Sequence, residues 1–154
     1  MKAQNDPHVR TEIRDGMRIT WHQPITMDDG LTLRADIYQP IDENIRCPVI
    51  LNYGIYGKGV AYQQGYPMQW EKMVTDHPEI LKMSSNKYQH WETTDPECWV
   101  PHGYAIVRID SRGAGWSPGF MDPSGPRSGK AGALPPRPPL RTVRATHAAY
   151  GSSQ

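Results

Sequence analysis

The feature that most constrains the fold is the stretch from His102 to Gly119, HGYAIVRIDSRGAGWSPG, in which a short apolar run leads into a glycine-rich turn. The apolar run ends where the polar cluster Asp110–Gly115 begins. This pattern is typical of a strand buried on both faces of a parallel or mixed sheet. We therefore expect an α/β fold in which the upstream strands lead into this one.

Composition indicates that part of the chain does not pack. The 154 residues are enough for one domain with a core. However, 15 prolines, 14 glycines and 37% apolar residues indicate a loop-rich protein. Asp122 is the last acidic residue, and the basic stretch 124–154 that follows contains the letters PPRPP. We expect 124–154 to be an irregular tail, either disordered or a polyproline II ligand for a partner domain.

Several classes of function are disfavoured by the residues. The basic tail has Tyr150 as its single aromatic side chain and no helical period, so we expect no nucleic-acid binding. Cys47 and Cys98 are too few for a disulfide framework or a zinc site, and no cofactor is expected. The start of the chain has no apolar core, and no stretch approaches the roughly 18 apolar residues of a membrane span. The expectation is a cytoplasmic protein without membrane contact, and its oligomeric state stays open.

The chain upstream reads as strands and turns. Residues 1–16 lack a period and predict a flexible lead-in. Met17–Met27 and Leu31–Tyr38 have alternating apolar residues on either side of Asp28-Asp29-Gly30, which predicts an antiparallel hairpin. Cys47–Tyr53 is a β-branched apolar run long enough for a central strand.

The glycine-rich loop Gly54–Gly59 follows that run, at the end of a strand where open α/β sheets bind ligands. Its Tyr56 could pack against neighbours or point its hydroxyl into a cleft as a donor to an oxyanion, and the residues alone leave both roles open. The aromatic-rich stretch 60–101 contains one predicted helix, Gln69–His77, which Pro78 ends. The rest, Lys82–Pro101, is a long loop of the kind that forms lids or binding walls.

Two motifs within His102–Gly119 do not carry their usual chemistry. Gly113-x-Gly115 does not complete the GxGxxG fingerprint of a dinucleotide site, because the third glycine, Gly119, comes one position late. Gly115–Gly119 matches the GxSxG of a nucleophile elbow, but Pro118 has no N–H for the oxyanion hole. A triad of Ser117, Asp122 and His147 leaves no room for the strands that should separate its members. We therefore interpret Ser117 as a loop residue, and the other histidines as surface or satisfied polar residues without metal-ligand spacing: His8, His22, His77, His90 and His102.

The end of the strand has a structural interpretation of its own. Asp110 is expected to accept backbone N–H bonds from the turn that follows it. Arg112 is expected to pair with Asp110 or with a neighbouring carboxylate. A catalytic Asp110 is the less favoured alternative.

In order and spacing, three segments resemble the N-terminal part of the cocaine esterase and X-prolyl dipeptidyl peptidase family, the CocE/NonD serine hydrolases. They are ITMDDGLTLRADIYQP, PVILNYGIYGKG and GYAIVRIDSRGAGWSPG, and the likeness covers about Met17 to Asp122. The resemblance implies a partial α/β-hydrolase fold over 17–123 and cleavage of an acyl ester, amide or X-Pro dipeptidyl substrate through an acyl-enzyme. It also implies that Tyr56 is the catalytic oxyanion donor, although Ile55 stands where the family usually has proline.

The family's nucleophile elbow, acid and histidine come later than this sequence extends, so we expect the chain alone to be inactive. The switch to a basic, proline-rich tail where the fold requires a helix suggests a shifted reading frame. The alternative function is a non-catalytic fragment or a small binding module that uses the aromatic-rich loop 60–101.

Overall fold

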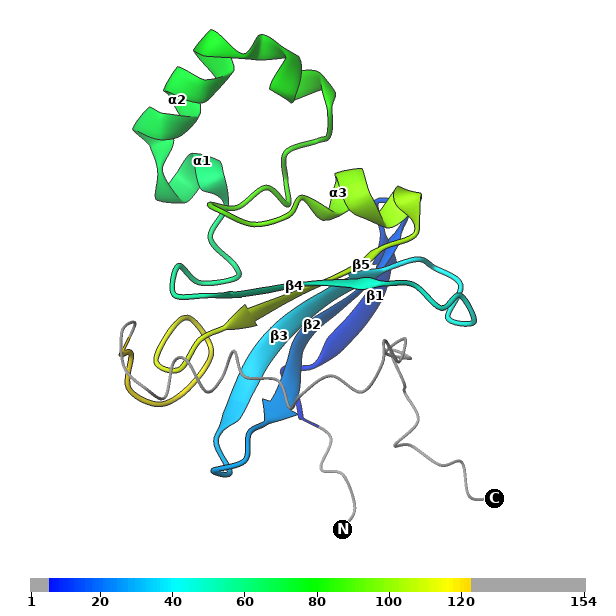
Figure 1. Ribbon diagram of the computed structural model, residues 1–154, viewed down its shortest axis with the longest axis vertical. Helices are drawn as coiled ribbons and strands as arrows, with labels where there is room; N and C mark the ends of the chain where they lie inside the picture. The colour runs from blue at the N-terminus through cyan, green and yellow to red at the C-terminus, as the bar shows by residue number, and fades with distance from the viewer. Residues whose placement is uncertain (1–5, 123–154) are drawn as a thin grey trace.

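A five-stranded mixed sheet organises residues 6–122, the part of the chain that the computed structural model describes (Figure 1). The strands lie in the order β1-β2-β3-β5-β4. The pairs β1–β2, β2–β3 and β3–β5 are antiparallel, and the pair β5–β4 is parallel. The mixed sheet confirms the predicted α/β class. The strands are β1 (Arg10–Arg14), β2 (Met17–Thr26), β3 (Thr32–Gln39), β4 (Val49–Gly54) and β5 (Ala105–Asp110).

The hairpin of β2 and β3 forms as predicted. The backbone N–H of Met27 donates to the carbonyl of Leu31 at 2.8 Å, and Gly30 supplies the turn's left-handed residue with φ +82°. Strand β2 also contains an irregularity in its pairing between Thr20 and Gln23. Within this bulge His22 has φ 55°, which turns its backbone N–H toward β3.

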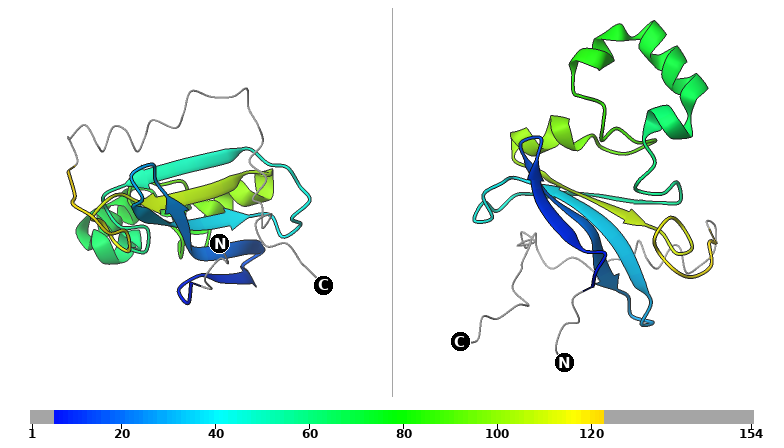
Figure 2. Two further views of the ribbon diagram at one scale, coloured as in Figure 1. Left: turned by 90° about the horizontal axis from the view of Figure 1, so that it is seen from below. Right: turned by 180° about the vertical axis from the view of Figure 1, so that it is seen from behind.

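A long crossover joins the parallel strands β4 and β5 and lies on one side of the sheet (Figures 1 and 2). Helix α2 confirms the predicted helix and begins slightly earlier, because Pro67 suits a first helical turn. The expected loop Lys82–Pro101 is wrong in part, since α3 and η2 interrupt it. Asp95 caps α3 by accepting the backbone N–H of Glu97 at 3.0 Å. The elements are α1 (Tyr62–Gly65), α2 (Pro67–Asp76), η1 (Pro78–Lys82), α3 (Pro96–Trp99) and η2 (Val100–His102).

The core lies between the sheet and this crossover. Tyr38 of β3 and Ile106 of β5 are opposite each other in register and pack with Tyr88 and Val100 from the crossover. Tyr38 meets Trp21 and Tyr88 edge to face. The crossover is therefore attached to the sheet by buried apolar contacts as well as by polar ones.

Two features differ from the sequence expectation. Residues 10–14 form β1, although the lead-in 1–16 was expected to be flexible. The strand forms because its backbone pairs with β2, while its side chains remain mostly exposed and so leave no apolar period. Strand β4 is at the edge of the sheet among the described residues, not in the centre, and Val49 and Leu51 are 36% and 43% exposed.

The tail 124–154 lies outside the described residues. The predictions of disorder, of a polyproline II ligand and of a shifted frame all concern this tail. They stay predictions.

Candidate functional site

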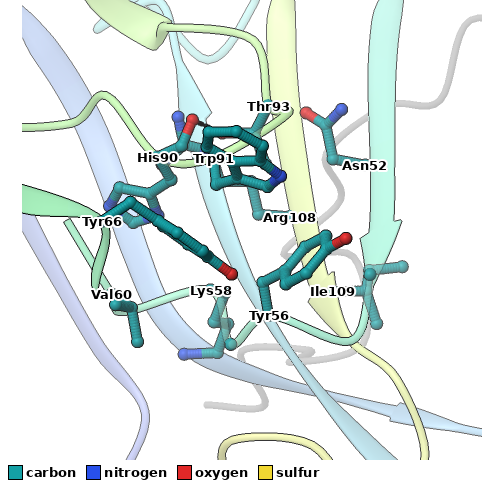
Figure 3. A pocket seen from close by; sticks show the side chains of 12 residues that line it. Asn52, Tyr56, Lys58, Val60, Tyr66, His90, Trp91, Thr93, Arg108 and Ile109 are labelled. Carbon is teal, nitrogen blue, oxygen red and sulfur yellow. Dashed lines mark hydrogen bonds between the residues drawn. The ribbon is translucent and has the colours of Figure 1, made fainter. Parts of the chain in front are cut away.

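A small hollow opens at the C-terminal end of β4, above the face of the sheet that the crossover covers (Figure 3). Three aromatic side chains, Tyr56, Tyr66 and Trp91, line it together with the basic side chains Lys58, His90 and Arg108. The enclosed volume is about 40 Å³, which holds a few water molecules. The residues that line the hollow form its wall. The hollow is too small to enclose a whole substrate.

Tyr56 lies in this wall, where sequence reasoning placed it. It is 44% exposed, and its ring meets Tyr66 edge-on at 6.2 Å. Among residues 6–122 its hydroxyl has no hydrogen-bond partner. A phenol O–H that is exposed, unpartnered and mounted on a loop at a strand end is free to donate to a ligand. Its catalytic role stays a prediction.

The loop that carries Tyr56 is fixed by Lys58, whose side chain is 2% exposed. The ammonium donates to Asp36 Oδ1 at 2.8 Å and lies 2.9 Å from Nδ1 of His22. Asp36 also accepts the backbone N–H of His22 at 3.0 Å. We call these three residues the Lys58 clamp.

Burial within the clamp favours the neutral form of His22. Burial lowers the pKa of the His22 imidazole, and the Lys58 ammonium lowers it further. A neutral ring leaves Nδ1 able to accept a hydrogen bond from the ammonium. The ring of His22 also packs on Trp116, with centroids 4.3 Å apart.

Asp110 joins the Tyr56 loop to the glycine-rich turn after β5. Its Oδ1 accepts the backbone N–H of Lys58 at 2.6 Å, and its Oδ2 accepts that of Trp116 at 2.8 Å. This confirms that Asp110 receives N–H bonds from its own turn. Arg112 was expected to pair with Asp110 or with a neighbouring carboxylate, and it pairs with the carboxylate of Asp29 at 2.7 Å. The stretch His102–Gly119 therefore supports the candidate site through Asp110.

Ser117, the serine of the GxSxG letters, has a structural role. Its side chain is buried, donates to the carbonyl of Asp110 at 2.7 Å and accepts the backbone N–H of Arg34 at 2.9 Å. It therefore holds the turn against β3, and the interpretation of Ser117 as a loop residue is confirmed. His147, which the triad would require, lies outside the described residues.

A polar row crosses three strands beneath the hollow. Asp36 of β3 and Asn52 of β4 are both opposite Arg108 of β5 in register. Arg108 is 1% exposed and donates through Nη2 to the carbonyls of Tyr88 at 2.6 Å and Thr94 at 2.8 Å. It also lies over the ring of Tyr38, so a buried cation fastens the crossover loop to the sheet.

His90 is the third basic side chain of the hollow. Burial, reinforced by the charges of Arg108 and Lys58, lowers the pKa of His90 to about 3. The hollow therefore contains a neutral imidazole at neutral pH.

Sequence reasoning missed four residues of this site: His22, Asp36, Lys58 and Arg108. Asp36 and Arg108 are charged residues inside otherwise apolar strand patterns, which is a signal of buried pairing. Lys58 directly follows the glycine-rich loop's Tyr-Gly, yet nothing in the sequence indicates its partner, which is 22 positions away.

No metal centre or membrane span is found among the described residues. Within 6–122 no group of three or more His, Cys, Asp or Glu side chains is arranged to hold a metal ion. No helix in the same range has the length and apolar character needed to cross a bilayer.

Comparisons with known proteins agree with the fold. The chain is similar to a CocE/NonD family hydrolase from Staphylococcus aureus in two crystal structures. One has a TM-score of 0.53 and 25% identity, covering 70% of this chain and 17% of that chain. The other has a TM-score of 0.57 and 22% identity, covering 77% of this chain and 21% of that chain. No curated protein matches.

The chain thus spans about a fifth of the length of the hydrolase that it resembles. The sheet is part of an α/β-hydrolase fold. A family profile, described as X-Pro dipeptidyl-peptidase (S15 family), matches residues 29–133, which is more than half of the chain. On this match, the chain belongs to the X-Pro dipeptidyl-peptidase (S15) family of hydrolases.

Proposed function

We propose that this chain supplies the first sheet strands and the oxyanion tyrosine, Tyr56, of a serine hydrolase. The reaction is cleavage of an acyl ester or amide, X-Pro dipeptidyl substrates included, through an acylated serine. The observation that carries this proposal is Tyr56 itself, which lines the hollow at the C-terminal end of β4 and whose hydroxyl has no hydrogen-bond partner among residues 6–122. Residues 17–123 form the hydrolase part in this proposal.

The chemistry asked of Tyr56 is donation of one hydrogen bond to a developing oxyanion. A donor held in place before the reaction stabilises the charge of the tetrahedral intermediate without reorganising. The loop anchors at Lys58 and Asp110 support such preorganisation, because they fix the backbone two residues after Tyr56.

The chain alone is proposed to be inactive. Ser117, the serine of its GxSxG letters, uses its hydroxyl for the Asp110 and Arg34 bonds. The nucleophile, acid and base are therefore proposed to belong to sequence that the relatives have beyond the region of likeness. Free thiols at Cys47 and Cys98 are consistent with a reducing compartment, and we propose the cytoplasm.

The first test is hydrolysis of 4-nitrophenyl acetate and alanyl-prolyl-4-nitroanilide by the 154-residue chain. We expect no turnover above the buffer rate. Turnover that disappears in Ser117→Ala, with folding retained, would overturn the assignment of Ser117 to structure.

The second test measures the donor itself with 4-nitrophenolate, a stable oxyanion, as the probe. A hydrogen bond to a charged acceptor contributes about 1.5–3 kcal/mol, so Tyr56→Phe should weaken binding about tenfold or more. Tyr62→Phe is the matched control, because Tyr62 belongs to the same aromatic cluster without lining the hollow. Equal affinity in wild type and Tyr56→Phe would contradict the oxyanion role.

A second candidate function is a non-catalytic binding module. Its support is an aromatic cluster on the crossover, in which Trp91 packs against Tyr66 at 4.6 Å and Tyr62 at 5.2 Å, and Tyr62 meets Trp70 at 5.6 Å. Binding of 4-nitrophenolate that is insensitive to Tyr56→Phe but is lost in Trp91→Leu would favour this candidate.

A further inference from the structure

The Lys58 clamp places a buried ion pair two residues from Tyr56. Both charged side chains of the pair are 2% exposed, and their separation is 2.8 Å. Burying such a pair costs desolvation energy, which apolar residues of similar volume would avoid. This cost suggests that the pair is present for its geometry as well as for stability.

The clamp fixes the Tyr56 loop from two directions. The side chain of Lys58 reaches β3 and β2 through Asp36 and His22, while its backbone N–H is held by Asp110 at the end of β5. The loop closes on itself through a bond of 3.3 Å from the N–H of Val60 to the carbonyl of Gly57.

Tyr56 itself has few contacts that could orient it. Its ring touches Tyr66 edge-on, and its hydroxyl has no partner among residues 6–122. The direction of its side chain therefore depends on the backbone to which it is attached. That backbone is set by the three strands that Lys58 joins.

We propose that Lys58 is a positioning residue, whose buried ammonium, held by Asp36 and His22, fixes the orientation of the Tyr56 side chain at the wall of the hollow. This inference rests on the proposed role of Tyr56. Lys58 does not touch the reacting atoms, because its ammonium is bonded to Asp36 and His22 within the clamp.

The test uses the full 154-residue chain with the paired substitution Lys58→Met and Asp36→Asn. Removing Lys58 alone leaves an unpaired buried carboxylate, which is strongly destabilising and can unfold a marginally stable chain. The pair removes both charges, and the asparagine that replaces Asp36 keeps an oxygen for the N–H of His22. The matched control is Lys72→Met with Asp76→Asn, an exposed ion pair of 2.7 Å within α2.

Two readouts follow the loop separately from overall stability. Amide hydrogen exchange should show about tenfold or greater loss of protection at the amides of residues 58 and 60, with the strand amides of β3 and β5 unchanged. Fluorine NMR of 3-fluorotyrosine at position 56 should show a changed shift and linewidth. The exposed control pair should change neither readout.

The affinity for 4-nitrophenolate completes the test. It should fall about tenfold in the clamp variant, to the level of Tyr56→Phe, and adding Tyr56→Phe to the clamp variant should cost nothing more. A folded clamp variant with wild-type exchange, fluorine signal and affinity would overturn the proposal. If wild type shows no Tyr56-dependent binding, the oxyanion role fails, while exchange and fluorine NMR still decide whether Lys58 orients Tyr56.

Discussion

Gly115 lies so close to the carboxylate of Asp110 that no side chain fits between them. A β-carbon at this position would overlap the Asp110 carboxylate, and Gly115 also has φ +50°. The same carboxylate holds the N–H groups of Lys58 and Trp116. The close approach at Gly115 therefore preserves the link between the glycine-rich turn and the Tyr56 loop.

Gly115→Ala should lower the free energy of unfolding by about 3 kcal/mol. The new methyl group must displace Asp110, which loses bonds to two amides, and the left-handed backbone adds about 1–2 kcal/mol of strain. Urea unfolding measures the change. Gly30→Ala is the matched control, because Gly30 has φ +82° with nothing within 4 Å and should cost only about 1 kcal/mol. Equal costs at the two positions would contradict the contact with Asp110.

Ser117→Ala should destabilise the chain by about 1–3 kcal/mol, because it leaves the partly buried backbone N–H of Arg34 without its acceptor. Thermal and urea unfolding measure the loss. Ser85→Ala provides a comparison at an exposed serine, which bonds Glu97 at the surface, and should cost less. Unchanged stability in Ser117→Ala would mean that the hydroxyl does not hold the turn to β3.

Arg108→Met should cost about 3 kcal/mol and loosen the loop that contains Trp91. Two carbonyls, those of Tyr88 and Thr94, lose their shared donor when the guanidinium is removed. Urea unfolding followed by tryptophan fluorescence, together with amide exchange over residues 88–94, measures both effects. Arg10→Met, at a side chain that is 65% exposed, serves as control. Native-like exchange in 88–94 would show that Arg108 does not fasten this loop.

Stability should fall as the pH drops below 6.5, because His90 resists protonation only in the folded state. Its pKa is about 3 when folded against 6.5 for the free side chain, so the unfolded chain binds the proton first. The stabilisation is complete above pH 6.5 and decreases by up to ~1.4 kcal/mol per pH unit between 6.5 and about 3.

Urea unfolding at a series of pH values from about 6.5 down to about 4.5 measures this slope while most carboxylates stay ionised. His90→Gln should reduce the slope and leave the part that His22 contributes, whereas His77→Gln changes an exposed histidine and serves as the control. A slope that is the same in His90→Gln and wild type would contradict the burial of a neutral His90.

The sequence was most informative where local rules decide the structure. The Asp28-Asp29-Gly30 turn specified the β2–β3 hairpin, because glycine adopts the left-handed conformation that the turn requires. The apolar run of Tyr104–Ile109 specified β5 and a mixed sheet. Pro118, together with the lack of room for a triad of Ser117, Asp122 and His147, argued against Ser117 as a nucleophile.

Local rules failed where pairing partners are distant. Strand β1 has no apolar period and exists through its backbone bonds to β2. Strand β4 has the β-branched apolar sequence of a central strand. It lies at the edge of the sheet because β5 is its single neighbour among residues 6–122.

By itself, the sequence determined the family, the strands that follow local patterns, and Tyr56 as the candidate donor. Only the tertiary structure decided what surrounds Tyr56. Lys58 reaches Asp36 and His22 across 22 and 36 positions of sequence, and Asp110 reaches Lys58 across 52. A buried charge acquires its role from the partners that the fold brings to it, and no local pattern encodes those partners.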